Sequence, residues 1–229
     1  MPKILKIQLL SADGHRPSAW RCDPNQPARA GVVILHAVYG LTDRMAAVCK
    51  IWADAGFIAV APALFDRLAP GLVHSYTRAG ADAGIQSFAA LTQDQIFADI
   101  DAASATINLP NATVISGFCS GGSWAWRAAA RCDATYLAQV NFYGSHIPAL
   151  IDLEPRCPTI LHYGDQDAIV SRSEIDRIRV RHPNVQTHVY ANTGHAFENP
   201  DQPTFNRAAA DAAWRASIAF VSRILAERA

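Results

Sequence analysis

The sequence has no excess of charge of either sign. Its 20 lysine and arginine residues balance 20 aspartate and glutamate residues, and charged residues make up only 17% of the 229 positions. No run of like charges interrupts this balance. Proteins that bind nucleic acid or anionic membranes concentrate basic residues on one face or in one segment. We therefore expect neither a nucleic-acid partner nor a membrane partner.

Long apolar runs are also missing. The most apolar stretch near the start, Ile4–Leu10, is short and is interrupted by Lys6 and Gln8. A signal peptide needs a longer apolar core, and a membrane-spanning helix needs about 20 apolar residues. The sequence therefore predicts a cytoplasmic protein.

Cysteine is present in an odd number and at scattered positions. Five cysteines without regular spacing argue against a disulfide framework, and no Cys/His spacing resembles a zinc site. We expect no metal. Four of the cysteines are predicted to be small buried apolar residues: Cys22, Cys49, Cys132 and Cys157.

Strand and helix patterns alternate along the chain. Gly31–His36 and Phe57–Ala61 are continuous apolar runs typical of central parallel strands. Thr92–Gln95 and Ser171–Glu174 are capping boxes that predict helix starts. We predict a single α/β domain over residues 1–229, with a doubly wound, mostly parallel sheet flanked by helices.

Residues 62–91 show no clear period. Such a long irregular segment in a compact domain is usually functional or mobile, and we expect this one to lie over the active site. The prediction depends on five helix-disfavouring residues: Pro62, Pro70, Gly71, Gly80 and Gly84.

The stretch Gly117–Gly122 separates a predicted buried strand from a predicted helix. Its sequence, Gly-Phe-Cys-Ser-Gly-Gly, matches the Gly-x-nucleophile-x-Gly pattern of a strand-to-helix elbow, with Cys119 as the nucleophile. Glycine leaves room beside a side chain on so sharp a turn, and the helix N-terminus favours a thiolate. The same residues would also suit a glycine-rich turn with no catalytic role. The choice between these two interpretations depends on whether the chain also supplies an acid and a histidine as partners.

Those partners follow in the chain order nucleophile, acid, histidine that α/β-hydrolases use. The turn Gly164–Asp167 follows one predicted strand, and Gly194–Phe197 follows another. Both turns fall at strand ends, where α/β sheets carry their sites. His195 is the candidate general base, and Asp165 and Asp167 compete for the role of the acid.

These three motifs together resemble the dienelactone hydrolase family, the cysteine-dependent members of the α/β-hydrolases. Leu35–Thr42 and Ala61–Asp66 are similar to that family as well. The resemblance implies the α/β-hydrolase fold and a triad of Cys119, Asp167 and His195. Asp165 is then left to bond the loop backbone.

The resemblance also implies an oxyanion hole made of backbone N–H groups. One belongs to Ser120, and the other to Ala37 or Val38. Many family members carry a glutamate at the position of Ala37, where it is thought to keep the resting cysteine neutral. Without it, we expect Cys119 to be paired permanently with His195.

A second departure concerns the arginines that bind a substrate carboxylate in the family. Arg78 matches one of them, although it reads equally well as a solvated surface residue, and Ala196–Asn199 contains no arginine. This argues against a strongly anionic substrate. Tyr39 and Phe197 are predicted apolar walls of the substrate site or, alternatively, packing residues.

The predicted function is hydrolysis of a small ester or lactone through an acyl-thiol intermediate, without a cofactor. A thioesterase or acyl transferase would use the same triad. A binding or sensor protein without turnover is a further alternative. We expect a small-molecule substrate and a monomer or small homo-oligomer.

Overall fold

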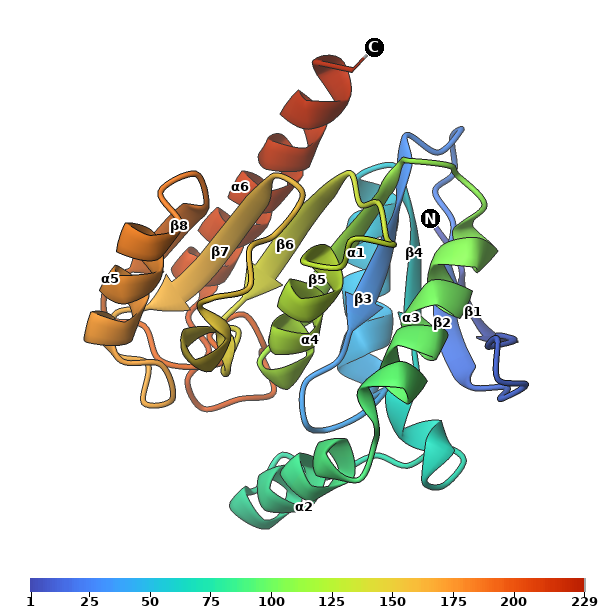
Figure 1. Ribbon diagram of the computed structural model, residues 1–229, viewed down its shortest axis with the longest axis horizontal. Helices are drawn as coiled ribbons and strands as arrows, with labels where there is room; N and C mark the ends of the chain where they lie inside the picture. Colours follow the sequence, from blue (N-terminus) through green and yellow to red (C-terminus); the bar gives the residue numbers. More distant parts are fainter. Residues whose placement is uncertain (229) are drawn as a thin grey trace. The chain divides into compact units, whose positions relative to one another are not determined.

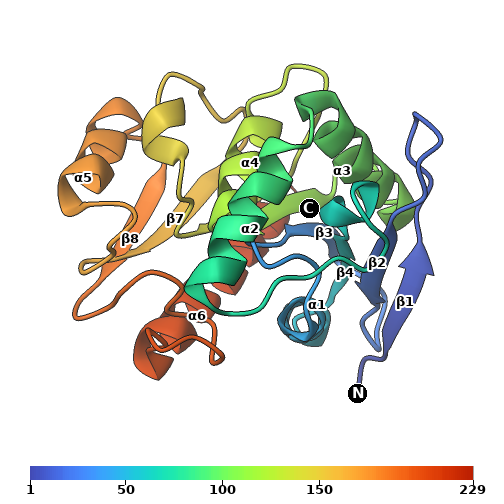
Figure 2. The ribbon, with the colours of Figure 1, turned by 90° about the horizontal axis from the view of Figure 1, so that it is seen from below.

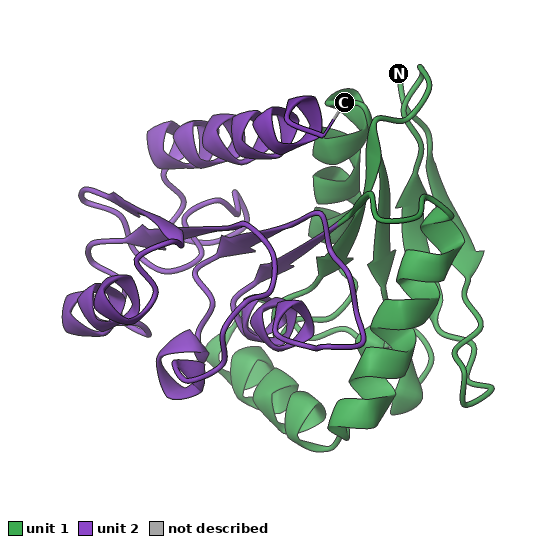
Figure 3. Ribbon diagram, turned by 45° about the horizontal axis from the view of Figure 1, so that its top comes forward, with its two compact units in different colours: residues 1–113 green, residues 114–229 purple. Residues whose placement is uncertain are grey.

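The computed structural model describes residues 1–228, which form two compact units (Figure 3). The first unit spans residues 1–113 and the second begins at residue 114. Strands and helices alternate along both, which confirms the predicted α/β class. That the whole chain is one domain stays a prediction.

The first unit is built on four strands. In spatial order they are β1 (Ile4–Gln8), β2 (Ser18–Cys22), β4 (Phe57–Pro62) and β3 (Ala30–Leu35). The first two pairings are antiparallel and the third is parallel. Helices α1 (Asp43–Asp54) and α3 (Gln93–Ile107) cover opposite faces of these strands (Figures 1 and 2). Every residue of β3 is buried, as its uninterrupted apolar sequence predicts.

The segment 62–91 corrects one prediction, because much of it is regular. It contains a 3₁₀ turn, Leu64–Arg67, and the helix α2 (Arg78–Ala89). The hydroxyl of Thr77 caps α2 by accepting a hydrogen bond from the Gly80 N–H at 3.1 Å. A Cβ atom at Gly84 would collide with the carbonyl oxygen of Val38. Gly80 and Gly84, which indicated a loop, are instead required where α2 packs closely on its neighbours, whereas Gly71 lies in a turn before the helix.

The second unit has four parallel strands, adjacent in chain order. They are β5 (Thr113–Phe118), β6 (Ala138–Phe142), β7 (Thr159–Gly164) and β8 (Gln186–Tyr190). Helices α4 (Ser120–Ala129) and α5 (Arg172–Arg181) lie on one face, and α6 (Arg207–Ala226) lies on the other (Figures 1 and 2). The carboxyl ends of all four strands therefore meet at one edge, where α/β proteins carry their sites.

Both predicted capping boxes are present. The Thr92 hydroxyl accepts from the Gln95 N–H while the Gln95 side chain accepts from the Thr92 N–H, at 3.2 and 2.9 Å. Ser171 and Glu174 make the same reciprocal pair at the start of α5. No helix among residues 1–228 is long and apolar enough to cross a membrane.

The cysteines only partly match their predicted burial. All five are free; Cys22 and Cys49 are buried, Cys157 is half-buried and Cys132 is exposed. The prediction for Cys132 was wrong because this residue follows the end of α4, where the chain turns through a short surface loop before β6.

Candidate active site

Cys119 lies at the turn between β5 and α4. Its backbone has φ 51° and ψ −117°, a conformation that non-glycine residues rarely adopt and that is often retained at functional sites. A Cβ atom at Gly117 would collide with the carbonyl oxygen of Gly121. The side-chain amide of Asn141 donates to the carbonyl oxygen of Gly122 at 2.6 Å and ties the start of α4 to β6. The glycines are thus needed for close packing, as the elbow motif predicts.

Asp167, and not Asp165, is hydrogen-bonded to the imidazole of His195. Asp167 Oδ2 accepts a hydrogen bond from His195 Nδ1 at 2.8 Å. Its other oxygen accepts the backbone N–H groups of Ile169 and Val170 at 2.8 and 3.0 Å. Asp165 Oδ1 accepts the N–H of Thr193 at 3.1 Å and so bonds the loop backbone.

The loop after β8 holds His195 in place. Thr204 donates its hydroxyl proton to the His195 carbonyl oxygen. The ring of Tyr143 packs against the imidazole, with 4.8 Å between ring centroids. A Cβ atom at Gly164 would collide with the Thr193 carbonyl oxygen, so glycine lets the loops after β7 and β8 approach each other.

The charges of Cys119 and His195 depend on each other. Burial opposes ionisation of the Cys119 thiol, but the charge and hydrogen bonding of His195, with hydrogen bonds from Ser145 and the Ser120 N–H, lower its pKa. Burial likewise disfavours the His195 cation, yet Cys119 and Asp167 raise its pKa. Nε2 of His195 is buried and has no well-aligned hydrogen-bond partner among the described residues. The pair therefore favours a thiolate beside an imidazolium.

Two further polar residues near the site, Tyr143 and Ser145, were missed by the sequence analysis. The hydroxyl of Tyr143 donates to Glu198 Oε1 at 2.7 Å, and both side chains are buried. Ser145 lies two residues beyond Tyr143 and its backbone N–H donates to the Cys119 carbonyl oxygen at 3.2 Å. Tyr143 and Ser145 follow the carboxyl end of β6, which was the available signal, because polar residues after neighbouring parallel strands converge.

Of the remaining predicted residues, Ser120 and Phe197 lie in the second unit. Ser120 is the first residue of α4, and its N–H lowers the pKa of Cys119. Phe197 is fully buried, with its ring 5.7 Å from that of Tyr143 and 5.3 Å from that of Tyr190. Its surroundings match the packing alternative.

The other four predicted residues belong to the first unit. The Ala37 carbonyl oxygen lies 2.7 Å from His36 Nδ1, Val38 is buried, and the Tyr39 ring packs edge-on against Tyr76 at 4.5 Å. The Arg78 side chain is 91% exposed and pairs with Asp82 at 3.1 Å. Exposure and an ion pair on its own helix are typical of a surface arginine. The roles of these residues in the oxyanion hole and in substrate binding stay predictions.

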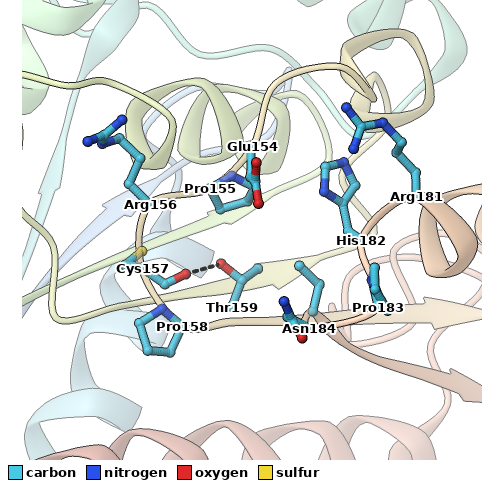
Figure 4. Close-up of a pocket in the computed structure, with 11 residues that line it drawn as sticks. Glu154, Pro155, Arg156, Cys157, Pro158, Thr159, Arg181, His182, Pro183 and Asn184 are labelled. Atoms are coloured by element: carbon cyan, nitrogen blue, oxygen red, sulfur yellow. Dashed lines mark hydrogen bonds between the residues drawn. The ribbon is translucent and has the colours of Figure 1, made fainter.

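A cavity of about 470 Å³ opens at the other end of β7 from Asp167 (Figure 4). It is lined by residues 154–159 and 181–185. Burial raises the pKa of Cys157 in this cavity to about 12, which makes it a poor nucleophile. None of the predicted site residues lines the cavity. No cluster of His, Cys, Asp or Glu within residues 1–228 could hold a metal ion.

Comparison with known proteins agrees with this fold. A model described as "Dienelactone hydrolase family" matches residues 18–225. Carboxymethylenebutenolidase 1 of Cupriavidus pinatubonensis is 27% identical over 220 residues, covering 89% of this chain and 90% of the relative.

Solved structures are similar over almost the whole chain. A Klebsiella pneumoniae structure named for dienelactone hydrolase superposes with a TM-score of 0.85 at 20% identity, covering 97% of this chain and 99% of the other. A dienelactone hydrolase-like promiscuous phosphotriesterase, P91, from metagenomic libraries gives 0.79 at 20% identity, with 96% and 98% covered. The chain therefore belongs to the dienelactone hydrolase family and is a hydrolase with the α/β-hydrolase fold.

Proposed function

We propose that the protein hydrolyses a small carboxylic ester or lactone through an acyl-thiol intermediate on Cys119. The observation that carries this proposal is the orientation of His195: Nδ1 is hydrogen-bonded to Asp167, which leaves the buried Nε2 as the nitrogen for proton exchange with Cys119 and the substrate. The lowered pKa of Cys119 beside this imidazole supports a thiolate nucleophile. The name of the Cupriavidus relative, a carboxymethylenebutenolidase, supports a lactone as one member of the substrate class.

In this mechanism the Cys119 thiolate attacks the carbonyl carbon and the carbonyl oxygen becomes an oxyanion. The Ser120 N–H stabilises that charge, and the second donor is the one predicted at Ala37 or Val38. When the intermediate collapses, the C–O bond breaks and Nε2 of His195 gives its proton to the leaving oxygen. In a lactone the alcohol remains attached to the acyl group.

The second half of the reaction regenerates the thiolate. Neutral His195 takes a proton from water, and the hydroxide attacks the acyl-thiol carbon. The C–S bond breaks, the carboxylic acid leaves, and the imidazolium again faces the thiolate. Asp167 keeps its hydrogen bond to Nδ1 and stabilises the charged imidazole.

Rapid mixing of the protein with a chromogenic ester tests this proposal. We expect a burst of one leaving group per protein molecule when deacylation is the slower step, followed by steady turnover, and mass spectrometry should find the acyl group on Cys119. Cys119→Ala should give neither burst nor turnover. A burst without later turnover would favour the binding or sensor alternative, and strong selectivity for thioesters over oxygen esters would favour a thioesterase.

Substrate charge should affect the rate. Residues 196–199 contain no arginine, Glu198 is buried near the triad, and Arg78 is exposed and paired. Because an unpaired carboxylate entering a partly dry pocket costs several kcal/mol, we expect kcat/KM for a neutral ester to exceed that of its carboxylate analogue by about tenfold or more.

The matched variant is Glu198→Gln, which removes a charge but keeps an oxygen to accept the Tyr143 hydroxyl. It should narrow the ratio of kcat/KM between the two esters, and because Glu198 is buried, the effect should change little at high salt. Glu227→Gln, at the exposed end of α6, serves as the control. A strong preference for the anionic ester that disappears in Arg78→Ala would contradict this prediction.

A further inference from the structure

The segment that follows β6 is bound to the nucleophile turn from both sides. The Cys119 N–H donates to the Phe142 carbonyl oxygen at 3.1 Å, and the Ser145 N–H donates to the Cys119 carbonyl oxygen at 3.2 Å. Tyr143 is held in turn by its N–H, which donates to the His162 carbonyl oxygen at 2.8 Å. Ser145 is therefore fixed beside the backbone of Cys119 by main-chain hydrogen bonds.

Glycines permit this close approach. A Cβ atom at Gly122 would lie 3.0 Å from the Gly144 Cα, and one at Gly144 would lie 2.6 Å from the Ile147 side chain. A larger residue at Gly122 would push Gly144 away from α4, and a larger residue at Gly144 would collide with Ile147 within the segment itself. The half-buried Ser145 is thus brought to the nucleophile by the same packing that forms the elbow.

His146 holds the Ser145 hydroxyl. Ser145 Oγ lies 2.9 Å from His146 Nδ1, and the His146 N–H donates to Ser123 Oγ at 2.8 Å. Ser123 in turn donates to the Cys119 carbonyl oxygen at 3.3 Å. A serine hydroxyl has one proton to give. In the tautomer with the proton on Nδ1, His146 donates a hydrogen bond to Ser145 Oγ. The Ser145 hydroxyl can then donate its own hydrogen bond to a different acceptor.

We propose that Ser145 is a further residue of the active site, which donates a hydrogen bond to the thiolate sulfur of Cys119 and is oriented by His146. This inference rests on the proposed function of Cys119 as the nucleophile. A donor to the charged form stabilises the thiolate relative to the thiol, and Ser145 is one of the groups that lower the pKa of Cys119. The ionisable groups that act on the two side chains within residues 114–228 are His195 for Cys119 and Arg127 for His146.

The test measures the pKa of Cys119 without any ester substrate. The rate at which iodoacetamide alkylates Cys119 is followed against pH by mass spectrometry of its peptide. Ser145→Ala should raise the apparent pKa by about one unit, so alkylation near the acidic end of the profile slows about tenfold. The limiting rate at high pH should stay the same or rise slightly, because a more basic thiolate is more nucleophilic.

Three variants distinguish this role from a structural one. Ser145→Thr keeps the hydroxyl and should restore the lower pKa. Ser123→Ala removes a hydroxyl that bonds only the backbone groups of His146 and Cys119, so it should raise the pKa of Cys119 by less than Ser145→Ala. His146→Ala, at an exposed position, should raise the pKa by less than Ser145→Ala.

An unchanged pKa in a folded Ser145→Ala would overturn the proposal, and so would an equal rise in Ser123→Ala. If Ser145→Ala does not fold, the absence of any shift in His146→Ala would count against it in the same way. A failure of the proposed function would be recognised by a different measurement. If Cys119→Ala still hydrolyses esters, Cys119 is not the nucleophile, and the alkylation profiles of the Ser145 variants remain valid measurements of the Cys119 pKa.

Discussion

Cys119→Ala should reduce ester turnover by at least about 10⁴-fold, because in the proposed mechanism the covalent intermediate forms on the Cys119 sulfur. Circular dichroism should show an unchanged fold, because alanine is smaller than cysteine and adds no atom that could collide with its neighbours. Cys119→Ser should also be severely impaired. A serine hydroxyl must lose its proton during attack, whereas the lowered pKa of the Cys119 thiol beside His195 favours the thiolate before attack.

Selective alkylation gives an independent measurement of the same residue. The pKa of Cys119 is lowered, so its reactive thiolate persists below the ordinary thiol range and is lost only as the pH falls through that lowered pKa. Burial raises the pKa of Cys22 and Cys49, and it raises that of Cys157 to about 12. Cys132 is exposed and is therefore the relevant competitor.

At pH about 6, well below the ordinary thiol pKa of about 8.5, iodoacetamide should label Cys119 first. Equal labelling of Cys132 and Cys119 at the acidic pH, together with full activity of Cys119→Ala, would reject the nucleophile assignment.

Asp167→Asn should lower kcat by about 10⁴-fold with little effect on folding. The amide oxygen can still accept the N–H groups of Ile169 and Val170, which preserves the turn. The amide NH₂ then faces His195 Nδ1 and forces that atom to accept, so the imidazole carries its proton on Nε2. In this tautomer Nε2 cannot take a proton from the thiol or from water.

Asp165→Asn is the matched control in the same turn. Its oxygen can continue to accept the Thr193 N–H, so we expect kcat to change by only a few-fold. We would compare kcat of the two variants by steady-state kinetics and verify by thermal unfolding that both are as stable as the unmodified protein. A larger loss in Asp165→Asn than in Asp167→Asn would reverse the assignment of the acid.

Local patterns in the chain were sufficient for most elements. The capping boxes at Thr92 and Ser171 depend on residues three positions apart. Buried strands such as β3 are recognised by their uninterrupted apolar sequence. The elbow is also a local feature, because a glycine such as Gly117 is required by the backbone of the turn itself, only four residues away at Gly121. Such features depend on near neighbours in the chain, which the sequence displays directly.

The helix α2 could not be predicted in this way. Gly80 and Gly84 disfavour a helix by intrinsic propensity, but close packing on Ser75 and Val38 requires them. Tertiary packing outweighs propensity here. The exposure of Cys132 is a similar case, since a cysteine is usually buried and only its place after the end of α4 puts it at the surface.

The sequence by itself determined the α/β alternation, the nucleophile elbow and the chain order of the candidate triad. Only the tertiary structure decided that Asp167 rather than Asp165 contacts His195, and that Ser145 and Glu198 lie near the same site. The reason is the parallel pairing of β5 to β8, which aligns their carboxyl ends at one edge. Residues far apart in the chain meet there. Which of the two aspartates on either side of Gln166 faces the histidine depends on how closely the loops after β7 and β8 pack.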